Sequence, residues 1–139
     1  MNTVFTTILF VLFLSNGSFA QKRNCLKYEP DIVTLSGVIE RHTFPGRPNY
    51  ESIKNGDEPE TVWILKLQKS ICVVAADSDQ FNETEYNARR MHLVLQPQQY
   101  KQYEKLLNRK VVVTGTLFHA ITGHHHTKVL LRTNEIKVQ

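Results

Sequence analysis

Apolar and polar residues alternate along five stretches of the chain, which is the period of half-buried β-strands. Two glycines, Gly37 and Gly115, fall in the middle of such stretches, and a glycine there is typical of a strand that coils sharply or bulges. The pattern predicts a mainly β protein. The apolar positions are Val33, Leu35, Gly37 and Ile39; Trp63, Leu65 and Leu67, continuing to Ile71 and Val73; Met91, Leu93 and Leu95; Val111, Val113, Gly115 and Leu117; and Val129 and Leu131, extending towards Ile136 and Val138.

Between the third and fourth stretches the period changes to that of a helix. Tyr100, Tyr103 and Leu107 recur at intervals of three and four residues, which is typical of one amphipathic helical face. Pro97 suits the first helical turn, and Asn108 can adopt the left-handed conformation that ends a helix. We therefore expect a helix over residues 97–107.

Three strands, one helix and then two strands is the element order of an OB-fold. This fold is a small five-stranded Greek-key barrel with one helix between strands three and four. Another small β-barrel or an open α+β sheet would also be compatible with the same pattern.

The N-terminus carries a different signal. Residues 4–14 read VFTTILFVLFL, and Ser18-Phe19-Ala20 follows as a small-x-small site. An apolar run of this length before such a site is typical of a cleavable secretory signal peptide and is too short to span a bilayer. We expect a signal peptide over residues 1–20 and a single domain over 21–139, located in the periplasm or secreted without a membrane anchor.

Two cysteines, Cys25 and Cys72, remain in the expected mature chain. In an oxidising compartment a single pair most simply forms one disulfide. Antiparallel pairing of the first two strands would also bring the end of the second, near Cys72, beside the start of the first. Two buried free thiols are the alternative.

Two segments do not have the composition of a scaffold. Residues 41–60 form a long connection rich in Pro, Gly and charge, and residues 119–127 contain four histidines. Long loops in compact domains are often functional, and the corresponding loops of an OB-fold flank its ligand-binding face. We expect the two segments to form one binding surface, with Tyr50 as an exposed aromatic anchor. The candidate binding residues are Phe44, Asn49, Tyr50, Glu51, Asp57, Glu58, Glu60, His119 and His125.

The histidines could also bind Zn²⁺ or Cu²⁺. If His119 faces the triplet across a hairpin, it pairs with His125, or with His124 after a one-residue slip. Carboxylates of the 41–60 segment could complete the shell, or the histidines could simply bond loop backbone. The candidate metal ligands are His119, His124, His125 and His126.

The chain resembles a family of small exported bacterial proteins defined as a domain of unknown function. The resemblance rests on Gly115-Thr-Leu-Phe-His-Ala-Ile-Thr-Gly-His-His-His-Thr127 with Val129-Leu-Leu131. Upstream, Cys25-Leu-Lys-Tyr-Glu-Pro30, Phe44-Pro-Gly46, Pro48-Asn-Tyr-Glu-Ser52 and Gly56-Asp-Glu-Pro-Glu60 are similar as well. The resemblance implies no function.

Catalysis and nucleic-acid binding are both disfavoured. The chain has no GxSxG motif and no cysteine outside the expected disulfide, although a catalytic triad could still assemble in space. The formal net charge is only +4, and Trp63 is the one aromatic on strands two and three that could stack on a base. We expect a non-catalytic module that binds a protein, as an inhibitor or immunity protein binds a cell-envelope toxin or hydrolase. The alternative is an envelope protein that binds a metal or small ligand.

Overall fold

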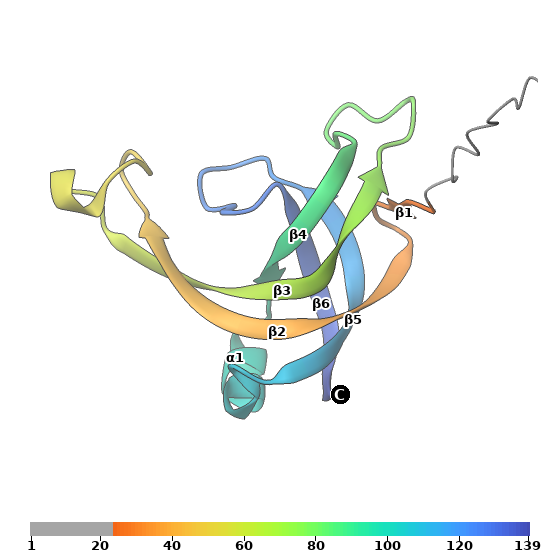
Figure 1. The fold of residues 1–139 in the computed structure, drawn as a ribbon. Helices are drawn as coiled ribbons and strands as arrows, with labels where there is room; N and C mark the ends of the chain where they lie inside the picture. The colour runs from red at the N-terminus through yellow and green to blue at the C-terminus, as the bar shows by residue number, and fades with distance from the viewer. Residues whose placement is uncertain (1–23) are drawn as a thin grey trace, which may run out of the picture.

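The structure is a computed structural model that describes residues 24–139, so the expected signal peptide over residues 1–20 lies outside the described residues. The described chain is mainly β, with one short helix (Figure 1). Single 3₁₀ turns lie at Ile53–Asn55 and Glu104–Leu106. The strands and helix are β1 (Leu26–Lys27), β2 (Ile32–Pro45), β3 (Pro59–Val74), β4 (Glu85–Val94), α1 (Pro97–Tyr103), β5 (Lys110–His119) and β6 (Val129–Val138).

The six strands form one mixed sheet with the order β1-β3-β2-β5-β6-β4. β3 also pairs with β4, so the pairings among the five long strands form a closed circuit. The contacts β2–β3, β2–β5, β3–β4 and β5–β6 are antiparallel, whereas β4–β6 and β1–β3 are parallel. The predicted count of five strands is wrong by one, because the two-residue β1 also pairs with β3.

The core lies on the face that the alternating pattern predicts. Ile39, Leu65, Met91, Val113 and Leu131 each have 0% exposure, and they come from all five long strands. Burying such side chains contributes roughly 1.5–3 kcal/mol each before conformational entropy is subtracted. The alternation of apolar and polar residues therefore identified the inner face correctly.

The two mid-strand glycines lie where the sheet changes pairing. Gly37 pairs with Leu67 of β3 and with Val111 of β5, so β2 passes there from one neighbour to the other. A Cβ added at Gly37 would lie 2.5 Å from the carbonyl oxygen of Lys66. The β5–β6 register shifts between Thr114 and Gly115, at the glycine where a sharp coil or a bulge was predicted.

The helix begins at the predicted residue, Pro97, but ends at Tyr103, four residues before the predicted end. Gln96 and Gln99 form a reciprocal capping box around Pro97, which satisfies free N–H groups of the first turn. After Tyr103 the chain continues as the 3₁₀ turn, and Asn108 adopts the expected left-handed conformation with φ of 60°. Within residues 24–139, no helix has the length and hydrophobicity needed to cross a membrane.

The predicted disulfide between Cys25 and Cys72 is present. Its Cα atoms are 4.7 Å apart, and the next residues along pair in register, Leu26 with Val73. The bond therefore fastens the N-terminal strand to β3 at the end of the sheet away from α1 (Figure 1).

Replacing both cysteines by alanine (Cys25→Ala with Cys72→Ala) should lower the free energy of unfolding by roughly 3–4 kcal/mol, because the cross-link closes a long loop in the unfolded chain. The size of this effect follows from the length of the closed loop, because the two cysteines are 47 residues apart in the sequence. Guanidinium denaturation of the oxidised protein and the double variant measures the difference. Equal free energies of unfolding would show that the disulfide does not stabilise the fold.

Candidate functional site

The connection between β2 and β3, residues 46–58 and hereafter the long loop, is ordered by one buried carboxylate. Asp57 is 5% exposed and accepts backbone hydrogen bonds from Asn49, Glu51 and Ser52, each at 2.8 Å. These bonds hold the pKa of Asp57 below its ordinary value, against the opposing effect of its burial. Asp57 and the backbone of Asn49, both among the candidate binding residues, therefore shape the loop.

A second carboxylate, on Glu60, joins the start of β3, just after the long loop, to the connection between β5 and β6. That connection, residues 120–128, is hereafter the histidine loop. Glu60 accepts hydrogen bonds from His124 Nδ1 at 2.9 Å and from His126 Nε2 at 3.0 Å. Partial burial raises the pKa of Glu60, but these two bonds outweigh it, and the net pKa is lowered.

Tyr50 extends this network into the long loop. Because the Glu60 carboxylate can only accept, Nδ1 of His124 carries a proton, and Nε2 of the neutral ring accepts the Tyr50 hydroxyl at 2.9 Å. The Tyr50 ring also lies against Gly123, where an added Cβ would be 2.7 Å from a ring carbon. Tyr50 has φ of 60°, a conformation that is unfavourable for a bulky residue. The prediction of an exposed anchor is wrong, because Tyr50 is half-buried and joins the two loops.

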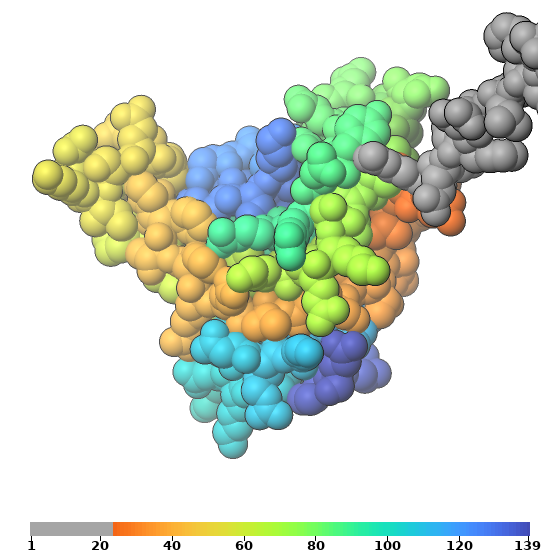
Figure 2. All heavy atoms as spheres, viewed as in Figure 1, coloured from red at the N-terminus to blue at the C-terminus, as the bar shows by residue number. Residues whose placement is uncertain are grey.

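The two loops adjoin at one end of the molecule, as Figure 2 shows for the long loop (yellow) and the histidine loop (blue). A small hollow of about 280 Å³ lies there, lined by Gly46, Arg47, Glu58, Pro59, Glu60 and His124. Glu58 of this lining and Glu51 of the long loop are both exposed. The sequence-predicted segments therefore form one continuous surface.

Beneath the histidine loop, three rings stack on the outer face of the sheet. His126 stacks on Phe44 with 4.4 Å between ring centroids and lies 5.8 Å from the ring of His92. This cover explains why Ile64 and Leu130, which pair with His92 on the two neighbouring strands, have 0% exposure. Strands β3, β4 and β6 are thus buried on both faces where the histidine loop crosses them.

His92 lies next to the candidate site, but the sequence pattern did not predict it as a site residue. It is 8% exposed, and its Nδ1 is a buried nitrogen without a hydrogen-bond partner in the described residues. Burial, together with the nearby His126 and His125, lowers the pKa of His92 to about 4. His92 lies on the outward face of β4, opposite the core face, so the local sequence pattern does not predict its burial. The outward face is buried only because the histidine loop, distant in sequence, crosses it.

The other two candidate histidines have separate roles. His125 Nδ1 accepts the backbone N–H of Ile121 at 2.9 Å, which makes it part of the loop's own structure. His119 pairs with Val129 across the hairpin, so the predicted pairing with His125 or His124 is wrong; the residues between them form a loop and not paired strands. His119 bonds instead to Glu85 of β4. The four predicted metal ligands therefore belong to three different sets of contacts.

Residues 90–137 match the model of a family described as Domain of unknown function (DUF4431). The matched segment contains α1, β5, the histidine loop, the second half of β4 and nearly all of β6, and it confirms a resemblance to a domain of unknown function. The long loop lies outside it. No curated protein matches the chain.

The burial of His92 should make the fold sensitive to mild acid. Its pKa is about 4 in the folded protein and about 6.5 in an unfolded chain. As the pH falls through this range, the unfolded state takes up the proton first, so the free energy of unfolding should fall, by about 3 kcal/mol in total. The variant His92→Leu should lose most of this dependence between pH 6.5 and 4 in urea denaturation. An unchanged slope in the variant would assign the acid sensitivity to other groups.

Proposed function

We propose that this chain is an exported, non-catalytic binding module of the OB-fold type that docks another protein through the long loop and the histidine loop. The partner would be a cell-envelope toxin or hydrolase, which the chain would bind as an inhibitor or immunity protein does. The observation that carries this proposal is a connected set of hydrogen bonds. Glu60 of β3 holds His124 and His126 of the histidine loop, and His124 also bonds to Tyr50 of the long loop, so two loops that are distant in sequence form one preformed surface.

The strand pairings support the OB-fold assignment. Numbered as in that fold, strands one to five correspond to β2 to β6, with α1 between strands three and four. β2 pairs with both β3 and β5, and β4 completes the circuit by pairing with β3 and β6. In OB-folds, ligands bind over strands two and three and beside the loops that follow strands one and four. The long loop and the histidine loop occupy those two positions.

The order of the long loop favours a binding role over that of a simple connector. Besides the Asp57 bonds, Gly46 N–H donates to Glu58 O at 2.6 Å and Glu58 N–H donates to Arg47 O at 2.7 Å. A loop held in one conformation before binding loses less entropy when a partner docks. Backbone strain such as that at Tyr50 is also typical of functional segments.

The character of the surface favours a protein as the partner. The two loops expose charges of both signs, such as Arg47 and Glu58, and the apolar Ile121, which is 65% exposed. A mixed surface of this kind is typical of protein interfaces, whereas nucleic acid requires a basic groove with accessible aromatics. Trp63 is 4% exposed and cannot stack on a base. The hollow of about 280 Å³ is at the lower limit of small-molecule sites, which have volumes of about 300–1,000 Å³.

The export component rests on separate observations. The apolar N-terminal run with its small-x-small site favours a cleaved signal, and the Cys25–Cys72 bond is typical of an oxidising compartment.

Two surface variants test the docking role in the exported protein. Ile121→Asp and Arg47→Glu change exposed side chains of the histidine loop and the long loop. Val138→Asp and Lys101→Glu make matched changes at exposed positions near the other end of the molecule, where β6 ends and α1 lies (Figure 1). Each variant would be crosslinked in envelope extracts, and any captured protein would be purified and its affinity measured.

The proposal predicts that wild type and both control variants bind one and the same protein. Ile121→Asp and Arg47→Glu should bind that protein at least about tenfold more weakly. A tenfold loss of affinity corresponds to about 1.4 kcal/mol of binding free energy, as expected for interface residues that contribute strongly. Melting temperatures should be similar in all four variants. Equal binding by all four variants, or loss of binding in the control pair alone, would contradict the proposed surface.

A further inference from the structure

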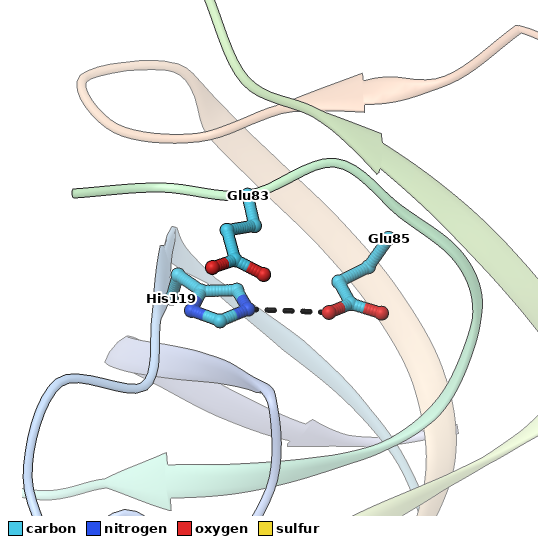
Figure 3. Close-up of side chains that lie close together, drawn as sticks. All are labelled: Glu83, Glu85 and His119. Carbon is cyan, nitrogen blue, oxygen red and sulfur yellow. Dashed lines mark hydrogen bonds and ion pairs between the residues drawn. The ribbon is translucent and has the colours of Figure 1, made fainter. Parts of the chain in front are cut away.

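A second cluster of charged side chains lies beside the histidine loop and takes no part in the surface proposed above. It consists of Glu83, before β4; Glu85, the first residue of β4; and His119, the last residue of β5. One ligand atom from each lies within 4.8 Å of the other two. Figure 3 shows the three side chains directed toward one another. Within residues 24–139, this is the one group in which three such atoms converge.

The two ring nitrogens of His119 have different partners, which fixes the chemistry of the cluster. Nδ1 lies 3.1 Å from the backbone carbonyl oxygen of Ala120. A carbonyl can only accept, so Nδ1 carries a proton. In the neutral ring, Nε2 therefore presents a lone pair, and it faces the Glu85 carboxylate oxygen at 3.2 Å. Two acceptors at that distance repel each other unless a cation lies between them, either a proton on Nε2 or a metal ion.

We infer that Glu83, Glu85 and His119 form a binding site for a divalent transition metal of the Zn²⁺ class. One imidazole nitrogen and two carboxylate oxygens are ligands that Zn²⁺ accepts, and three protein ligands leave a coordination position for water. A metal-bound histidine usually donates its other N–H to a carboxylate, a backbone carbonyl or water, and the carbonyl of Ala120 has this position here. The ligands differ from the histidine triplet, so the inference does not depend on the proposed docking surface.

The surrounding contacts hold the ligands in position. The Tyr28 hydroxyl donates to the backbone oxygen of Glu83 at 2.7 Å, and Asn82 Oδ1 accepts the backbone N–H of His119 at 2.8 Å. The side chains of His119 and Glu85 are only 12% and 15% exposed, which limits competition from water. Preorganised ligands of this kind favour metal binding.

Lys128 provides a variant that should strengthen metal binding, whereas variants of the ligands should weaken it. Its Nζ lies 3.2 Å from Glu85 Oε1, and its side chain is 76% exposed. The ammonium group therefore competes for the carboxylate that a metal would use, yet it can move into solvent without disturbing the core. Removing this charge should strengthen metal binding.

The site can be tested by isothermal titration calorimetry, in which ZnCl₂ is added to the mature, disulfide-bonded protein near neutral pH. We expect one Zn²⁺ per chain. His119→Gln, Glu85→Gln and the exposed Glu83→Gln should each weaken binding by at least about tenfold, the smallest effect typical even of an outer-shell change. Lys128→Met should bind more tightly than wild type. The double variant His124→Gln with His126→Gln should retain wild-type affinity. Zn²⁺ should also raise the melting temperature of wild type and not that of Glu83→Gln.

Absence of saturable Zn²⁺ binding by the wild-type protein would overturn the inference. So would loss of binding in the His124/His126 double variant with full binding in Glu83→Gln, because the metal would then lie in the histidine loop. If His119→Gln fails to fold, Glu83→Gln and Lys128→Met decide the question, since both residues are exposed. Loss of docking without loss of Zn²⁺ binding, or the reverse, separates this inference from the proposed function.

Discussion

The carboxylate of Glu60 accepts hydrogen bonds from two histidines that lie 64 and 66 residues further along the chain. Each oxygen is used once, so one side chain fixes two rings and, through His124, the hydroxyl of Tyr50. A hydrogen bond to a charged group contributes roughly 1.5–3 kcal/mol, enough to offset the ordering of a few loop residues. The joined surface of the long loop and the histidine loop depends on this interaction.

Its effect extends into the body of the sheet. With His126 held by Glu60 and stacked on Phe44, the histidine loop covers the outer face of β3, β4 and β6. That cover buries His92 as a neutral ring and encloses a second apolar layer outside the main core. Stability in mild acid and the shape of the candidate surface therefore have a common structural origin.

Much of the scaffold could be predicted from local patterns in the sequence. The inner faces of the long strands, the irregular register at Gly115, the left-handed Asn108 and the disulfide all follow from period, residue type and the expected oxidising compartment. The pairing of His119 with Val129 and the two-residue β1 could not be predicted, because both depend on where separate strands meet in space. His92 was missed for the same reason: an outward strand position becomes buried only when a loop from elsewhere crosses it.

The most direct test of the central claim is hydrogen–deuterium exchange of wild type, Glu60→Gln and the exposed control Glu58→Gln. The amide group of Gln can accept at only one atom, so it cannot replace both bonds of the Glu60 carboxylate. Backbone amides of the long loop and of the histidine loop should lose protection together in Glu60→Gln, while the amides of β5 keep their wild-type protection. In Glu58→Gln, protection should be as in wild type throughout. If only one loop loses protection in Glu60→Gln, or neither does, Glu60 does not couple them.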